Sequence, residues 1–269
     1  MSVTGSATIS GSGIHSGLVA MVSITRREGG IAFRRGATEI PARVQHVGAT
    51  ERTTTLVKDG AMVGLVEHLL AALRVAGFYG GVLIESDRDE LPILDGSAQP
   101  WYELLTELGP PPPAPPPLAV ARRIEVRHGA GRATAVPGPE WLDCAIDFAH
   151  PAIGAQAWRG GPGDYGQLLA ARTFGLLAEA EYLKSRGLAL GADLDRAIVF
   201  GDEGPLRPLR FPNEPVRHKA LDALGDLALL GRPLAARVTI ERGSHTLHHR
   251  LMSALCAATA AGDEAASTP

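Results

Sequence analysis

Two polar residues, Glu67 and His68, lie within the segment MVGLVEHLLAAL, which is otherwise apolar on nearly every side. Such a segment predicts a buried helix, and a buried carboxylate and imidazole need partners because desolvating an unpaired charge is costly. An arginine is one candidate partner and a metal ion is the other. Adjacent helical residues point about 100° apart, so His68 can bind a metal ion while Glu67 reaches toward a water molecule beside it.

A second polar group occurs in FPNEPVRHKALDALGDLALL, residues 211–230. At 100° per residue, His218, Asp222 and Asp226 fall within about 80° on one face of a helix. A solvent-exposed polar face is the simplest interpretation of this stripe. The His-x-x-x-Asp spacing also suits two ligands of one metal ion, and Gly225 removes side-chain bulk beside them.

Together the two segments offer His68, His218 and Asp222, which leave the fourth position of a tetrahedral site free for water. Three protein ligands of nitrogen and oxygen are typical of catalytic zinc, whereas structural zinc usually has four ligands, often cysteines. Zinc lowers the pKa of bound water to about 7, so these residues predict a metal-dependent hydrolase. The pattern is not HExxH, because Ala71 stands three residues after His68.

These side chains must be positioned by a mixed set of elements. Hydrophobic periodicity predicts an α+β fold. The expected strands are 18–27, 52–60, 80–86, 118–127, 141–148, 196–200 and 236–242, and the expected helices are 64–77, 97–108, 164–187 in most of its length, 211–230 and 247–262. The proline run GPPPPAPPP, residues 109–117, favours a stiff polyproline connector. We therefore expect two related domains, 1–109 and 118–269, each a sheet layered with helices and joined by a linker at 110–117.

Composition restricts the class of protein. The net charge of -3 provides no positive field for nucleic acid, and the two cysteines, Cys144 and Cys256, form no CxxC pair. We see neither a signal-peptide pattern nor the roughly 20 apolar residues that span a bilayer. We expect a soluble cytoplasmic protein with reduced thiols, which we take to be a monomer.

Several long motifs resemble one family. They are VEHLLAAL, ELPILDGSAQPW, IDFAHPAIG, ARTFGLLAEAEYLKSRGLALG, LDRAIV and VRHKALDALGDLALLG. Together they are similar to the UDP-3-O-acyl-N-acetylglucosamine deacetylases, zinc amidases of lipid A biosynthesis. The resemblance runs from about Ser10 to Leu255. It implies two domains of related α+β sandwich fold with the active site between them, and an acylated UDP-amino-sugar as the substrate.

The resemblance also implies roles for particular residues. His68, His218 and Asp222 match the ligands of one zinc ion per chain, with iron(II) as the alternative metal, and Glu67 matches the general base. His245 matches a histidine that acts as an acid, and Asp226 would orient it and hold it charged.

Further matches concern the substrate. Thr173 resembles a threonine that helps to polarise the substrate amide, and Phe174 would contact the sugar or acyl group. Lys219 and Arg242 match positions that hold the substrate, Arg242 near the diphosphate. The stretch 175–199 resembles an insert that forms an apolar passage for the acyl chain, which suggests transient contact with a membrane surface.

The sequence departs from the family pattern around His245. Ser244 precedes it in place of a glycine, and His248 and His249 follow in place of asparagines. The three histidines form either a solvated helix start or a separate metal site. A family lysine near the diphosphate has no counterpart in RATAVPGPEW. Two alternative functions therefore stay open: a zinc amidase with another substrate, and a catalytically silent relative that binds the acylated sugar.

Overall fold

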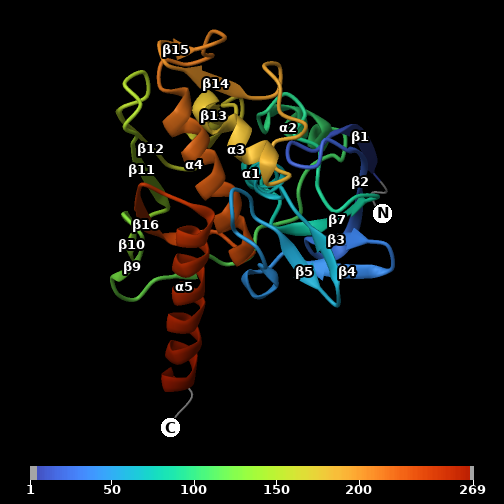
Figure 1. Ribbon diagram of the computed structural model, residues 1–269. Helices are drawn as coiled ribbons and strands as arrows, with labels where there is room; N and C mark the ends of the chain where they lie inside the picture. The colour runs from blue at the N-terminus through green and yellow to red at the C-terminus, as the bar shows by residue number, and fades with distance from the viewer. Residues whose placement is uncertain (1–4, 267–269) are drawn as a thin grey trace.

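The computed structural model describes residues 5–266, with side chains described up to Thr259. Figure 1 shows two sheets on opposite sides of the molecule with helices between them. The first sheet has the strand order β1-β2-β7-β3-β4. Its strands are β1 Ser6–Ser12, β2 Val19–Gly30, β7 Gly80–Ser86, β3 Ala32–Arg35 and β4 Thr38–Pro41. Only the β3–β7 pair of this sheet is parallel.

The second sheet has the strand order β12-β11-β16-β10-β9, with β8 also paired to β16. Its strands are β12 Ala155–Gly160, β11 Trp141–Asp147, β16 Leu234–Glu241, β10 Gly131–Pro137, β9 Ile124–His128 and β8 Leu118–Ala119. Within the five-strand order, β11 and β16 are parallel and the other neighbours are antiparallel. Read from β9 to β12, the second sheet has the same sequence of parallel and antiparallel neighbours as the first sheet read from β1 to β4.

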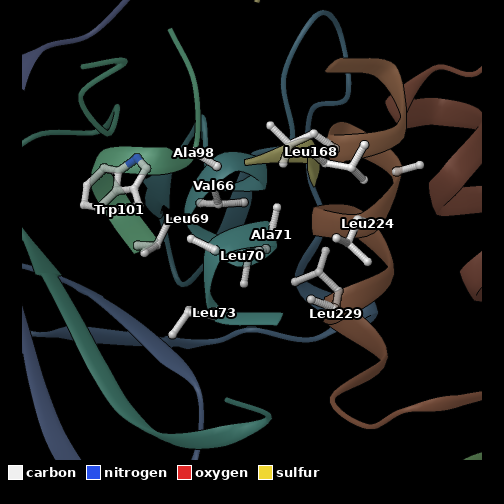
Figure 2. Packing of buried hydrophobic residues seen from close by; sticks show 14 of the residues in the cluster. Val66, Leu69, Leu70, Ala71, Leu73, Ala98, Trp101, Leu168, Leu224 and Leu229 are labelled. Atoms are coloured by element: carbon white, nitrogen blue, oxygen red, sulfur yellow. The ribbon is translucent and has the colours of Figure 1, made fainter. Parts of the chain in front are cut away.

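The helices that carry most of the predicted site lie between the two sheets. They are α1 Glu67–Val75 and α4 Glu214–Leu227, which pack against each other. Figure 2 shows Leu70 and Ala71 of α1 in the interior between Leu224 of α4 and Trp101 of α2 Gln99–Thr106, with Leu69 facing Trp101. The long helix α5 His245–Ala266 packs on β9 and β10 and runs beyond the sheets (Figure 1).

The predicted α+β class is confirmed, and the halves share the same strand order. The buried apolar side chains of both halves nevertheless belong to one core cluster. The division into domains 1–109 and 118–269 therefore stays a prediction. Residues 111–117 have no regular secondary structure, and Pro111 and Pro112 lie against Gly77 and Gly81 of the first half.

The predicted helix over 164–187 is wrong in its middle. The segment contains the 3-10 turn Tyr165–Leu168, the strand β13 Phe174–Leu176, the 3-10 turn Leu177–Glu179 and only a short helix, α3 Ala180–Ser185. The strand forms because β13 pairs in parallel with β14 Ile198–Gly201, which itself pairs with β15 Gly204–Pro205. Gly175, a poor helix former, lies at its centre.

Other predicted element boundaries also differ from those in the structure. The strand expected over 118–127 is interrupted between β8 and β9, and the strand over 52–60 is reduced to β5 Leu56–Lys58, which pairs with β6 Ala61–Val63. The final helix starts at His245, two residues earlier than expected. Two further 3-10 turns are Val44–His46 and Ala228–Leu230. Within residues 5–266, no helix is both long and apolar enough to cross a membrane.

Candidate metal centre and active site

Close packing of α1 on α4 brings the two predicted segments together. Gly225 of α4 lies directly against the backbone of α1, where a Cβ atom would come 2.0 Å from the carbonyl oxygen of Glu67. Any larger residue would push the helices apart. The contact places His68, at the second position of α1, opposite His218 and Asp222 on α4.

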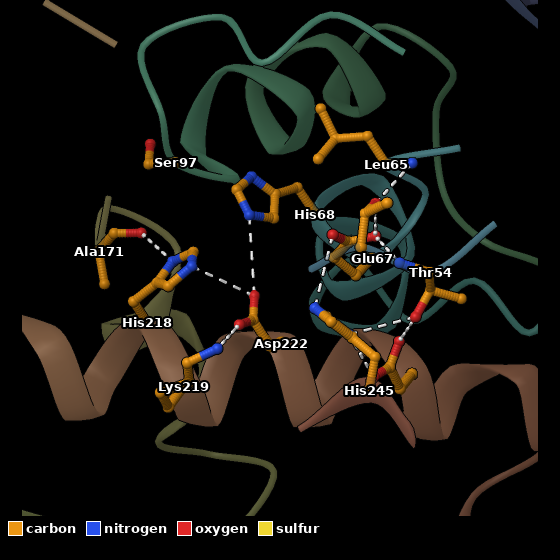
Figure 3. Close-up of polar contacts among 12 residues, drawn as sticks. Thr54, Leu65, Glu67, His68, Ser97, Ala171, His218, Lys219, Asp222 and His245 are labelled. Atoms are coloured by element: carbon orange, nitrogen blue, oxygen red, sulfur yellow. Dashed lines mark hydrogen bonds and ion pairs between the residues drawn. The ribbon is translucent and has the colours of Figure 1, made fainter. Parts of the chain in front are cut away.

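Three donor atoms converge at this helix contact, as Figure 3 shows. The Nε2 atoms of His68 and His218 lie 3.8 and 3.4 Å from the same Asp222 oxygen, Oδ1. One ligand atom from each of the three buried residues lies within 4.8 Å of the others. Bonds of about 2.0–2.1 Å in a tetrahedral zinc site place ligand atoms about 3.4 Å apart. The spacing therefore fits ligands around a metal ion better than a set of direct hydrogen bonds.

The protonation states suit metal binding as well. Burial lowers the pKa of His68, and lowers that of His218 to about 3, so both imidazoles are neutral. Burial alone would raise the pKa of Asp222, but His218 and Lys219 outweigh it and hold the pKa well below its usual range. Metal ligands must be deprotonated, and these three candidate ligands are.

Neighbouring groups orient two of the three ligands. His218 Nδ1 lies 3.4 Å from the Ala171 carbonyl oxygen, which can only accept, so Nε2 keeps its lone pair for a metal. Lys219 Nζ donates to Asp222 Oδ2 at 2.9 Å and leaves Oδ1 turned toward the histidines. His68 Nδ1 is buried and has no partner within the described part of the chain.

Glu67, the first residue of α1, has its carboxylate fixed beside the metal ligands. Its Oε2 accepts hydrogen bonds from the Thr54 backbone N–H at 3.0 Å and the Thr53 hydroxyl at 3.2 Å. Its Oε1 lies 3.8 Å from His245 Nε2. Burial raises the pKa of Glu67 to about 7, against the opposing charge of His245. A carboxylate poised near neutral pH is suited to take up a proton.

His245, the first residue of α5, is suited to give up a proton, whereas Glu67 is suited to take one up. Its Nδ1 donates to Asp226 Oδ2 at 2.8 Å. Burial alone would lower its pKa, but Asp226 and Glu67 raise the pKa to about 9. His245 is therefore a cation at neutral pH, and its Nε2 carries a proton toward the cavity. Thr54 bonds the other Asp226 oxygen, Oδ1, through its hydroxyl at 2.6 Å.

A second histidine bonds the same carboxylate. His248 Nδ1 lies 2.7 Å from Asp226 Oδ2, the oxygen that also bonds His245. Asp226, His245 and His248 are close enough to suggest a metal ion. The two short N–O distances are instead those of hydrogen bonds, in which both Nδ1 atoms carry hydrogen and offer no lone pair. The alternative of a metal site at His245, His248 and His249 is therefore not supported, because His248 turns to Asp226.

A cavity of about 220 Å³ opens beside these groups. Its wall includes Glu67, His68, Asp222 and His245, and also three residues predicted to contact substrate: Thr173, Phe174 and Lys219. The rest of its wall is largely apolar and includes Ile14, Leu176, Leu183, Ala189, Ala192 and Val199. The polar and apolar parts match a ligand with a polar reacting group and an apolar extension.

Thr173 and Phe174 are positioned by contacts between distant segments. Thr173 N–H donates to the Gly96 carbonyl at 2.7 Å. The preceding Arg172 pairs with the buried Glu214 at the start of α4 through Nε at 2.9 Å. Phe174 packs edge-to-face on His218, with ring centroids 6.0 Å apart. The same loop thus touches the ligand helix and the cavity.

Arg242 is the predicted substrate-binding residue that the structure does not place at the cavity. It lies outside the set of residues in the cavity wall and pairs with Asp147 at the surface. Its role near a diphosphate stays a prediction. The sequence interpretation also missed His15, Arg52 and Thr54: the first two lie in the cavity wall, and Thr54 links Glu67 to Asp226.

Comparisons with known proteins agree with the family that the sequence motifs resemble. Residues 1–257 match the family model described as UDP-3-O-acyl N-acetylglycosamine deacetylase. The chain is similar to proteins named UDP-3-O-acyl-N-acetylglucosamine deacetylase from three bacteria. Identity is 42% with that of Thermosynechococcus vestitus (94% of this chain, 92% of the relative) and 41% with that of Myxococcus xanthus (91% and 82%). For Wolinella succinogenes the identity is 38%, with 92% and 87% covered.

Proposed function

Because the chain belongs to the UDP-3-O-acyl N-acetylglycosamine deacetylase family, we propose that it hydrolyses the N-acetyl group of UDP-3-O-(3-hydroxyacyl)-N-acetylglucosamine. Water breaks the amide C–N bond, and the products are acetate and the free amine of the acylated UDP-glucosamine. The reaction would be an early committed step of lipid A biosynthesis. One observation carries the proposal: a buried base, Glu67, and a buried acid, His245, lie 3.8 Å apart beside three convergent metal-type ligands.

The ligands proposed for the metal ion are His68, His218 and Asp222, with one zinc ion per chain and iron(II) as the alternative. Neutral imidazole and carboxylate donors suit either ion. When bound, such an ion acts as a Lewis acid that acidifies water and polarises a carbonyl group. The neutral histidines and the ionised Asp222 support this assignment.

The proposed proton transfers use residues of the chain itself. Glu67 Oε1, the oxygen not bonded to Thr53 or Thr54, takes the proton of the attacking water. His245, held as a cation by Asp226, stabilises the negative charge that develops on the amide oxygen and gives its Nε2 proton to the leaving amine. The two groups start in opposite protonation states at neutral pH, as a base and an acid must.

The remaining residues of the cavity are proposed to bind substrate. Thr173 assists in polarising the amide, Lys219 positions the sugar, and Phe174 contacts the sugar or acyl group. The apolar wall would take the 3-hydroxyacyl chain. Arg242 is kept as a proposed diphosphate contact on family resemblance alone.

We also propose that the protein meets its lipid-linked substrate at a membrane surface. Leu177, Tyr182 and Leu190, from the segment that contributes to the apolar wall, are more than half exposed. Both cysteines are free, which agrees with a reducing cytoplasm. A monomeric state stays a prediction.

A substrate comparison tests this function. We expect acetate release from the 3-O-acylated UDP-sugar and far slower release from UDP-N-acetylglucosamine, which lacks the acyl chain. Cleavage of simple N-acetyl amines without turnover of the acylated nucleotide sugar would identify an amidase of another substrate. Binding of the acylated sugar to the zinc-loaded protein with no acetate release would identify a silent relative.

A further inference from the structure

Asp226 serves two histidines through a single oxygen atom. His245 Nδ1 and His248 Nδ1 lie 2.8 and 2.7 Å from Asp226 Oδ2, and the Thr54 hydroxyl bonds Oδ1 at 2.6 Å. All four side chains are buried. The carboxylate therefore accepts from three side-chain donors, and of these only His245 is part of the cavity wall.

The protonation of His248 follows from its contacts. Its Nδ1 must carry hydrogen, because the Asp226 carboxylate is ionised and can only accept. Burial alone would raise the pKa of Asp226, but its contacts with His245 and His248 hold that pKa at about 2. Its Nε2 is buried beside Gly243 and has no hydrogen-bond partner within the described residues. A hydrogen on Nε2 would have no acceptor there, which is costly for a buried donor. We therefore assign the ring hydrogen of His248 to Nδ1.

We propose that His248 is a positioning residue for His245: by sharing Asp226 Oδ2, it fixes the carboxylate and weakens the hold of that carboxylate on the His245 proton. The inference rests on the proposed function, in which His245 must release this proton to the leaving amine. An unshared Asp226 would concentrate its charge on His245 and keep the proton on the ring to a higher pH. His248 would thus set how readily the acid gives up its proton.

The other charged groups around His245 do not depend on His248. Glu67 faces it from α1, Asp222 and Asp226 face it from α4, and His248 lies one turn along α5. Changing His248 alone therefore alters one hydrogen bond to Asp226 and leaves the carboxylates in place. Any change in the titration of His245 then reports on that bond.

Two substitutions distinguish the effect of the His248 hydrogen-bond donor from the effect of the volume of its ring. His248→Leu fills much of the same space and removes the donor, whereas His248→Asn offers a neutral N–H at about the position of Nδ1. His249→Leu is the matched control, because His249 is the adjacent histidine of α5 and is only half-buried, with no bond to Asp226 among the described residues. A purely structural role would not distinguish the three variants by the titration of His245.

The measurement is the titration of His245 by ¹⁵N NMR in the zinc-loaded protein, together with the pH dependence of kcat. In His248→Leu we expect the pKa of His245 to rise by roughly 0.5–1 unit and kcat at neutral pH to fall several-fold. We expect His248→Asn and His249→Leu to match the wild type in the titration. In the wild type, the ¹⁵N shifts of His248 should show the Nδ1–H tautomer, an observation that needs no variant.

Three results would overturn the inference: an unchanged His245 titration in His248→Leu, a shift in His248→Asn equal to that in His248→Leu, or an Nε2–H tautomer of His248 in the wild type. The titration requires no substrate. A protein that fails to release acetate would disprove the proposed function while the NMR result still decided the role of His248.

Discussion

At the scale of single residues, the site depends on two buried groups whose environments move their pKa values in useful directions. Glu67 sits in an apolar helix, so burial raises its pKa to about 7 despite the nearby His245 cation. His245 is buried too, yet Asp226 and Glu67 overcome that burial and raise its pKa to about 9. The order of the two pKa values leaves Glu67 ionised and His245 protonated over the same range of pH, as the proposed base and acid require.

The role of Glu67 can be separated from metal binding by Glu67→Gln. The amide keeps an oxygen for the Thr54 N–H but cannot take a proton from water. We expect kcat to fall by about 10²–10⁴-fold while one zinc ion per chain is retained. Activity and metal content should be measured on the same preparation. Loss of zinc in proportion to loss of activity would make Glu67 a ligand.

The pH dependence of kcat/KM follows from the same two groups. Activity should rise as Glu67 loses its proton, at or below pH 7, because a bound cation lowers the pKa from its metal-free value of about 7. It should fall as pH increases through about 9, where His245 loses its proton. In His245→Gln the alkaline fall should vanish and the remaining rate should be low. A wild-type profile still rising above pH 10 is incompatible with an acid role for His245.

The same raised pKa of His245 affects stability. A group with a folded pKa of about 9, above its unfolded value of 6.5, stabilises the fold fully below pH 6.5. This contribution is lost as pH rises through 9. Alkaline loss of activity and of stability should therefore occur together.

At the scale of secondary-structure elements, the contact between α1 and α4 decides whether the proposed metal ligands meet. The Gly225→Ala substitution would place a Cβ atom 2.0 Å from the Glu67 carbonyl oxygen, which neither helix backbone can accommodate without moving. We expect destabilisation of roughly 1–3 kcal/mol or more and weaker zinc binding, measured by thermal unfolding and metal titration.

Gly166→Ala provides the matched control for this prediction, because a Cβ atom there would have no neighbour within 4 Å. It should leave stability and zinc affinity close to those of the wild type. Equal effects of the two substitutions would show that the close approach of α1 and α4 is not what holds the ligands together.

Elements with regular periodicity could be predicted from the sequence, and irregular ones could not. The helical spacing of His218 and Asp222 and the apolar surroundings of His68 are local signals, so the ligand set emerged from short segments. The strand Phe174–Leu176 was missed because it forms only by pairing with residues 198–200. The strand Gly131–Pro137 is rich in small residues and ends at a proline, so it gave little strand signal.

The contacts that complete the site could not be predicted either, because they also join residues far apart in the sequence. Thr54 reaches Asp226 across 172 positions of the chain, and no local pattern marks such a pair. His248 was noticed only as a departure from the family pattern, although its place one turn after His245 puts both rings on one face of a helix. That spacing was the available signal for their shared partner.

At the scale of the whole molecule, the duplicated strand order explains where the site lies. Each half contributes one helix that precedes the central strand of its sheet, α1 before β7 and α4 before β16, and these equivalent helices pack together. The proposed metal ligands thus come from both halves. We propose that residues 1–109 and 118–269 are related units joined by the proline segment, with the metal ion bound where they meet.

The most direct test of the account is a zinc titration of metal-free protein, with acetate release from the acylated UDP-sugar followed at each addition. We predict that activity rises in proportion to zinc and reaches its maximum at one equivalent per chain. His68→Ala, from the first half, and His218→Ala, from the second, should each abolish the rise. Full turnover in metal-free wild type, or an unchanged titration in either variant, would contradict a shared metal site between α1 and α4.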